Sequence, residues 1–240
     1  MLAAAKLAFV LAGMAVIPQG TYSPLYATMG VERVMVRRFA LDREPVTRGE
    51  FLEFVRRHPE WRKSAVQSTA ADRGYLADWS SDLSAGTIAD LRRPVTSVSR
   101  KAALVYCAAE GKRLPTSAEW EYAAAASETK RNAVRDKAFI SRLIGFYTRR
   151  AATGTATVGK SPANAYGVRD MHELVWEWTL DPMHSSHSGH ENHMYCASSA
   201  IGAADPSNYA AFMRYAVRSG LNDQSTLKTL GFRCAGTLAG

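Results

Sequence analysis

The 240-residue sequence lacks internal repeats, low-complexity tracts and any stretch whose composition would mark a linker between domains. These absences argue against a repeat array and against a disordered chain, because such proteins carry a fixed period or a strongly biased composition. Hydrophobic residues make up 47% of the chain and charged residues 22%, which is enough apolar surface for one sizeable core. We therefore expect one globular domain over residues 14–240.

Acidic residues are also scarce: 22 Asp and Glu stand against 30 Lys and Arg, a formal net charge of +8. Such an excess favours acidic partners in general. However, the basic residues occur as scattered pairs, without the basic and aromatic stripe typical of a nucleic-acid platform. We therefore expect no nucleic-acid partner. The pairs are Arg37-Arg38, Arg56-Arg57, Arg92-Arg93 and Arg149-Arg150.

The apolar run at the N-terminus, from Leu7 to Ile17, is too short to span a bilayer, which needs about 20 apolar residues. One lysine, Lys6, precedes this run, and a charged-then-apolar order is typical of a secretory signal. We expect residues 1–13 to be a signal-like segment and the protein to be exported, for example to the periplasm. The alternative is a buried N-terminal element of a cytoplasmic protein. No stable transmembrane anchor is expected.

Capping residues predict three helices, which begin after Thr47, Ser99 and Thr116. A glutamate three residues later completes a capping box at the first and third of these positions, because its carboxylate satisfies a free backbone donor. A fourth helix is predicted over residues 132–147. Between the first two helices, residues 59–94 are predicted to be irregular and packed by their own side chains.

Strand-like patterns occupy residues 31–42 and most of the chain beyond Gly159. In that second half, the segments LVWEWTL, FMRYAVRS and LGFRCAG are each predicted to be a short strand. The sequence thus predicts an irregular, loop-rich α+β domain, with several helices in its N-terminal half and short strands in its C-terminal half.

Cysteine is rare, and the chain has only Cys107, Cys196 and Cys234. In an oxidising compartment two of them can pair, which leaves one thiol that is reactive or binds metal. In a reducing compartment all three can be small buried apolar groups. The residues alone leave both alternatives open.

Four sequence blocks occur in a fixed order over most of the chain. Together they resemble the signature blocks of the formylglycine-generating-enzyme, or sulfatase-modifying-factor, family, and the segment from Cys196 to Ser219 is similar to its short single-domain branch of nitrite-reductase accessory proteins. The resemblance implies an elaborated C-type-lectin-like fold. The blocks are PVTRGEFLEF, PVTSVSRKAALVYCAAEGKRLPTSAEWEYAAAA, NAYGVRDMHELVWEW, and MRYAVRS followed by LGFRCAG.

The resemblance also implies a structural disulfide and a loss of chemistry. Cys107 and Cys234 match positions that are paired in several family members, which agrees with export. Active relatives bind copper(I) with a cysteine pair and use oxygen to convert a substrate cysteine to an aldehyde. The matching positions here are Asp205 and Ala210. A carboxylate and a methyl group cannot replace soft thiolates, so sulfatase activation by that mechanism is not expected.

A calcium site of the family is altered as well. Glu173 and Leu174 stand where the family carries a Gly-Asn pair beside this site. Leu174 has no oxygen to offer a hard cation, whereas Glu173 does. Calcium therefore stays an open alternative.

A histidine cluster is the strongest metal-binding pattern in the chain. Its histidines are spaced three residues apart in DPMHSSHSGHENHMYC, and the run is closed by a cysteine. Imidazole and thiolate together suit copper or zinc. The alternative is an exposed polar loop in which the histidines are accidental. The predicted metal ligands are His184, His187, His190, His193 and Cys196.

Cys196, Arg214 and Arg218 are the predicted catalytic residues. Cys196 would act as a metal ligand or a redox thiol. The forked guanidinium groups of the two arginines would clamp a substrate carboxylate. The alternative for both arginines is an internal ion pair with Glu177, Asp170 or Asp205.

Two functions remain, and the fold alone cannot choose between them. The first is an exported accessory or maturation protein that modifies or metallates a partner protein or peptide. The second is a non-catalytic peptide- or glycan-binding module on a lectin-like scaffold. In either case the residues predicted to contact the substrate are Trp178, Ser198 and Ser199, although a tryptophan in this block is also a candidate core residue.

The metal prediction is tested by calorimetric titration with copper(I) and with zinc. Wild type should bind at least one of these metals, because the cluster supplies soft and borderline ligands. A variant in which Cys196 and the four histidines are replaced should lose that binding. Equally weak binding by the two proteins would contradict the prediction.

Overall fold

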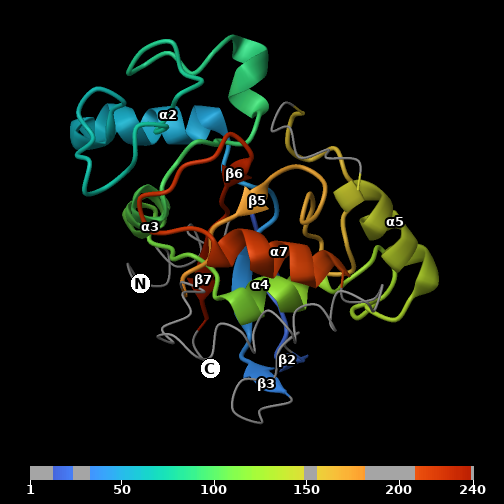
Figure 1. Cartoon of the computed structure of the whole chain (residues 1–240). Helices are drawn as coiled ribbons and strands as arrows, with labels where there is room; N and C mark the ends of the chain where they lie inside the picture. Colours follow the sequence, from blue (N-terminus) through green and yellow to red (C-terminus); the bar gives the residue numbers. More distant parts are fainter. Residues whose placement is uncertain (1–12, 24–32, 149–155, 182–208, 239–240) are drawn as a thin grey trace, which may run out of the picture.

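The computed structural model describes residues 13–23, 33–148, 156–181 and 209–238. They form the predicted α+β arrangement, in which helices pack around small sheets (Figure 1). A three-stranded antiparallel sheet has the order β1-β4-β7, with the bounds Met14–Ile17, Phe39–Asp42 and Ala235–Thr237. Ile17 pairs with Phe39 on one side of β4, and Phe39 pairs with Thr237 on the other. Strands from opposite ends of the described sequence therefore meet on one central strand.

The predicted strand over residues 31–42 is divided between two sheets. β3 (Val34–Val36) pairs with β2 (Gly20–Tyr22), whereas β4 belongs to the three-stranded sheet. The exposed Arg37 and Arg38 lie between the two strands. One continuous strand is thus a wrong prediction, because the chain changes its pairing partner at these arginines.

The three capped helices begin where the sequence predicts them. They are α2 (Arg48–Arg57), α3 (Arg100–Ala109) and α4 (Ser117–Ala124). In the first, the Thr47 hydroxyl accepts the backbone N–H of Glu50 at 3.2 Å and the Glu50 carboxylate accepts that of Thr47 at 2.8 Å. This reciprocal pair is the predicted capping box.

The fourth helix, α5, covers Lys137–Thr148 and so begins later than the predicted residue 132. The reason is Asp136, whose carboxylate accepts the backbone N–H groups of Ala138 at 3.0 Å and Phe139 at 3.2 Å. An aspartate in this role marks the start of a helix. Phe139 and Leu143 are buried, as predicted for this helix.

The predicted strand in FMRYAVRS is wrong, because these residues belong to the helix α7 (Tyr209–Ser219). Its buried residues are Ala210, Arg214 and Arg218, which are spaced four apart and share one helical face. Arginine is ordinarily exposed, so a helix whose inner face carries arginines shows no apolar helical stripe in its sequence. The other two segments do form strands, since β5 (Trp176–Glu177) pairs in parallel with β6 (Leu230–Gly231), which is followed by β7.

The irregular region over residues 59–94 is packed by its own aromatic side chains, as predicted. It contains two short 3-10 helices, η2 (Pro59–Trp61) and η3 (Ile88–Arg92). Tyr75 and Trp79 are 3% and 2% exposed, and the Tyr75 hydroxyl donates to the carbonyl of Trp61 at 3.0 Å. This region caps the main hydrophobic cluster, which α2 and α3 also build.

The disulfide between Cys107 and Cys234 is present and joins α3 to the residue before β7, across 127 positions of sequence. This confirms the pairing implied by the resemblance. Both half-cystines are fully buried. Within the described residues, no helix combines the length and the apolar character needed to cross a membrane.

Loss of this disulfide should destabilise the fold strongly. The Cys107→Ala/Cys234→Ala variant should lose about 4 to 5 kcal/mol of unfolding free energy in urea, the entropic value for a loop of roughly this length. Cys196→Ala is the control and should unfold like wild type. Mass spectrometry without reductant should find Cys107 linked to Cys234; two free thiols in protein from its native compartment would contradict the pairing.

Candidate functional site

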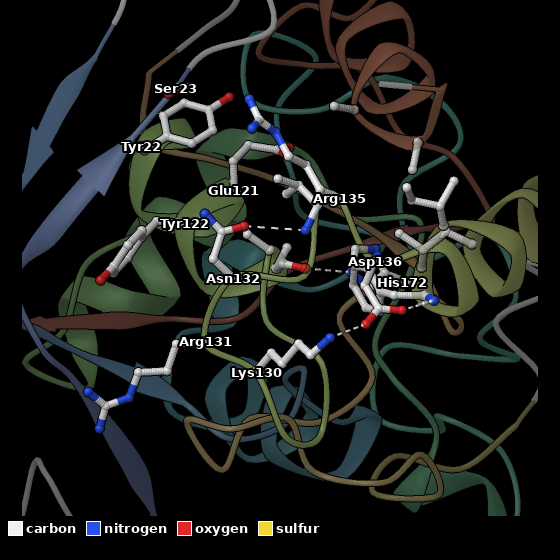
Figure 2. A pocket seen from close by; sticks show the side chains of 18 of the residues that line it. Tyr22, Ser23, Glu121, Tyr122, Lys130, Arg131, Asn132, Arg135, Asp136 and His172 are labelled. Atoms are coloured by element: carbon white, nitrogen blue, oxygen red, sulfur yellow. Dashed lines mark hydrogen bonds and ion pairs between the residues drawn. The ribbon is translucent and has the colours of Figure 1, made fainter. Parts of the chain in front are cut away.

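A cavity of about 940 Å³ lies between α4, α5, α7 and the end of β2. Tyr122 lies on one side of it, and Asp136 and His172 lie on the other (Figure 2). Helix α7 adds Ala210 and Arg214 to the lining. Figure 1 shows α7 running alongside α4, with α5 near one end of α7, and these three helices supply most of the elements that line the cavity. It is the candidate site for a ligand.

An ion-pair cluster joins α4 to α7 at this cavity. Arg214 donates to both oxygens of the Glu121 carboxylate, from Nε at 2.8 Å and from Nη2 at 2.5 Å. Arg218 donates to the same carboxylate at 2.9 Å. Burial alone would raise the pKa of Glu121, but the two guanidinium groups outweigh it and hold the pKa below its ordinary value. Glu121 is therefore an ionised carboxylate held inside the protein.

Both guanidinium groups lie over the indole ring of Trp120, at 5.2 Å for Arg214 and 4.8 Å for Arg218. This contact is a cation–π interaction, which favours arginine at a desolvated site. The Trp120 ring is 1% exposed. The cluster thus lies on an aromatic base that fixes both arginines.

His172 is neutral in this environment. Burial and the neighbouring Arg214 guanidinium lower its pKa to about 3. Its Nε2 lies 2.8 Å from the carbonyl of Ala124, so this nitrogen carries the proton and donates. The other nitrogen, Nδ1, then accepts from Arg214 at 3.5 Å. His172 therefore bridges the carbonyl of Ala124 in α4 and the guanidinium group of Arg214, and it also lines the cavity.

Beneath the cluster lies a second buried ion pair. The indole N–H of Trp120 donates to Glu177 at 2.6 Å, and Arg233 donates to both oxygens of Glu177 at 2.8 Å. Arg233 and Glu177 both have 0% side-chain exposure. This pair anchors the base of the site to β5 and to the segment between β6 and β7.

The structure brings the two predicted arginines together but keeps Trp178 apart from them. Arg214 and Arg218 do form an internal ion pair, yet its partner is Glu121; Glu177 binds Arg233, and Asp170 accepts backbone N–H groups. Trp178 is 5% exposed, donates its indole N–H to the carbonyl of Val98 at 2.8 Å, and belongs to the main hydrophobic cluster, whereas Trp120 belongs to a separate one. The remaining predicted site residues lie outside the described residues: His184, His187, His190, His193, Cys196, Ser198 and Ser199.

The described part of the chain contains no group of three or more His, Cys, Asp or Glu side chains that could hold a metal ion. Glu173 is exposed, whereas Leu174 is buried at 5% among apolar side chains, so these two do not form a calcium site together. The copper or zinc ligands of the histidine cluster lie outside the described residues and stay a prediction.

Copper chemistry of the two-cysteine type does not fit the described residues that line the cavity. Ala210, which the family resemblance assigns to a lost cysteine, is on α7 and lines the cavity. Its methyl group has no lone pair to offer copper(I). Asp205, the other assigned position, lies outside the described residues.

Glu121 and His172 are the site residues that sequence reasoning missed. Glu121 follows the capping Glu119 by two positions, and a glutamate on a helix is ordinarily exposed. The sequence signal that could have pointed to Glu121 is the four-residue spacing of Arg214 and Arg218. Two arginines that are buried on one helical face need an acidic partner. His172 stands inside the quoted block MHELVWEW but carried no motif of its own.

Comparison with known proteins adds a consistent set of relatives. Residues 3–238 match the family model described as a sulfatase-modifying factor enzyme 1-like domain. Formylglycine-generating enzyme from Mycobacterium tuberculosis is 28% identical, over 85% of this chain and 89% of that protein. Inactive C-alpha-formylglycine-generating enzyme 2 from Bos taurus is 31% identical, over 85% of this chain and 79% of that protein. Among solved structures, PvdO from Pseudomonas aeruginosa aligns with a TM-score of 0.49 at 22% identity, covering 94% of each chain.

The neutral state of His172 makes stability depend on pH. Its folded pKa of about 3 lies below the unfolded value of about 6.5, so the unfolded chain gains a proton first as pH falls. The contribution to stability is complete above pH ~6.5 and is lost as pH falls toward 3. When the pH is lowered from 7 to 4.5, the free energy of unfolding measured in urea should therefore fall by up to about 2 kcal/mol more in wild type than in His172→Gln. His58→Gln is the control; equal losses in wild type and His172→Gln would contradict the assignment.

Proposed function

This chain belongs to the sulfatase-modifying factor enzyme 1-like family, and from this membership we propose that it is an exported accessory protein that holds a segment of a partner protein in its cavity. It does so without the copper-dependent conversion of a cysteine to an aldehyde. The observation that carries the proposal is the cavity itself, which has a volume of about 940 Å³. Ala210, at the position assigned to a lost cysteine, contributes only a methyl group to its wall.

The size of the cavity supports a ligand larger than one side chain. Pockets for small molecules measure about 300 to 1,000 Å³, and this one lies at the upper end of that range. Apolar groups of α5 and polar groups of the 130–136 segment both line it. A peptide segment, with its mixture of backbone and side-chain groups, suits such a lining.

The rigidity of the wall supports binding without chemistry. Arg214 and Arg218 are fixed by Glu121 and Trp120, so their guanidinium groups are held in place before any ligand arrives. Among the described lining residues, His172 is the only histidine, and its neutral form already donates to the carbonyl of Ala124. These groups shape and position; they are not free to exchange protons with a substrate near neutral pH.

Export is supported by the buried disulfide. Cys107 and Cys234 are linked, and structural disulfides persist in oxidising compartments such as the periplasm. Metallation or metal-dependent modification of the partner would depend on residues 184–196, for which the copper(I) and zinc titration is the test.

Crosslinking tests the partner-binding role. A photoreactive amino acid at Ala211, which lines the cavity, should capture one defined segment of one partner protein in the cells that make this chain. The same amino acid at Leu83, an exposed residue of the 59–94 region, is the matched control and should capture nothing specific. Mass spectrometry identifies the crosslinked peptide. Identical products from both positions would contradict a cavity-bound partner.

An activity assay tests the proposal that the protein does not convert a cysteine to an aldehyde. A sulfatase-type cysteine peptide, incubated with the protein, copper(I) and oxygen, should yield no aldehyde, whereas a catalytically active relative should convert it. Aldehyde formation above the level without protein would overturn the assignment of Ala210.

A second candidate, glycan binding, is favoured by Tyr22 and Tyr122 on the cavity lining, because aromatic side chains offer large contact area together with a polar hydroxyl. Specific binding to a glycan array, lost in Tyr122→Ala, would support this candidate over the peptide.

A further inference from the structure

The cavity lining carries an excess of positive charge. Among the described residues that line it, five side chains are basic and two are acidic. His172 adds no charge, because its pKa is lowered to about 3. The basic residues are Arg33, Lys130, Arg131, Arg135 and Arg214, and the acidic residues are Glu121 and Asp136.

Both carboxylates already have cationic partners. Glu121 accepts hydrogen bonds from Arg214 and Arg218, as described above. Asp136 accepts from the ammonium group of Lys130, and Figure 2 shows that side chain reaching toward it. The hydrogen bond from Lys130, with those from the backbone of α5, lowers the pKa of Asp136 and keeps it ionised. On the described part of the lining, no further acidic group balances the other arginines.

Arg33, Arg131 and Arg135 are these other arginines. All three are exposed, and in the described part of the chain none of them forms a salt bridge. Arg131 lies 5.9 Å from the ring centroid of Tyr166, which orients its guanidinium group without neutralising it. Scattered arginines are usually solvated, but these three border one cavity.

Another part of the lining is apolar. Phe139, Ile140 and Leu143 of α5 contribute to it, together with the alanines of α7. Val134, which precedes Arg135 in the sequence and is 41% exposed, adds a further apolar side chain to the lining. A ligand that satisfies the whole cavity must therefore present both anionic groups and apolar groups.

We propose that the cavity selects an acidic and partly apolar peptide segment, whose carboxylates meet Arg33, Arg131 and Arg135 while an apolar side chain packs on α5. This rests on the proposed function, because it names the kind of partner segment that the cavity holds. Arginine suits carboxylates through its fork of donors. Among the described lining residues the apolar wall of α5 carries a single aromatic ring, Phe139, whereas a nucleic-acid strand is typically bound on a series of stacked rings.

Fluorescence anisotropy with labelled peptides tests the proposal on the full chain. The probes are a peptide of glutamate, leucine and glycine, its analogue with glutamine at every glutamate, and an oligothymidine strand. The acidic peptide should bind more tightly than the glutamine analogue, and its affinity should fall as salt rises. Arg131→Gln/Arg135→Gln should raise its Kd about tenfold, because two charge contacts are lost.

Matched variants distinguish an effect of this site from an effect of the protein's net charge. Arg56→Gln/Arg57→Gln removes the same charge from α2 and should change the Kd less than about twofold, since an exposed distant charge is screened. Val134→Glu should weaken binding of the acidic peptide, whereas Val134→Gln should weaken it less. All of these positions are exposed, so folding should be unaffected.

Three outcomes would overturn the inference: equal affinity for the glutamine analogue, equal losses in the two double-arginine variants, or tighter binding of oligothymidine that the cavity variants abolish. Failure here is distinguishable from failure of the proposed function. If the Ala211 crosslinker captures a neutral or basic partner segment, the partner-binding role stands and the acidic selectivity is wrong.

Discussion

The guanidinium group of Arg233 lies fully inside the protein, and the surrounding structure is arranged to satisfy its donors. It binds both oxygens of Glu177 and the backbone carbonyls of Asp42, Arg43 and Arg169. A buried ion pair is not itself a large source of stability, but removing one partner costs about 3 to 5 kcal/mol because the other charge is left without a counterpart. This requirement fixes β4, β5 and the segment before β7 relative to one another.

The candidate site is built on that anchor in two further steps. Glu177 also accepts the indole N–H of Trp120, which sets the position of α4. Trp120 then supports the two guanidinium groups of α7, and the Glu121 carboxylate, at the next position of α4, binds both of them. From the core to the cavity wall, an ion pair is thus followed by a hydrogen bond to an indole, by cation–π contacts and by a second ion pair. In such a network each group is positioned by the one beneath it, so the wall is rigid although it is polar.

Local signals in the sequence predicted most of the helices, because a cap is a contact between residues three positions apart. Thr47, Ser99 and Thr116 each accept the backbone N–H that their position predicts. The family resemblance supplied the pairing of Cys107 with Cys234, which no local rule contains. Helix α7 could not be recognised, because its inner face carries Arg214 and Arg218 and its alternating Met213, Tyr215 and Val217 imitate a strand. Glu121 and His172 were missed for a related reason: their roles arise only when helices distant in sequence are packed together.

The placement of β4 between β1 and β7 has a consequence for how the chain acquires its structure. Strand β7 lies almost two hundred residues downstream of β4, roughly the length of the domain, and non-local pairing of this kind slows folding. Until β7 has been synthesised, one edge of β4 has unpaired backbone groups that can recruit strands from other molecules. A nascent chain that has already built its helices is therefore still open to aggregation, and β7, which follows all the other described strands in the sequence, is the one that closes that edge.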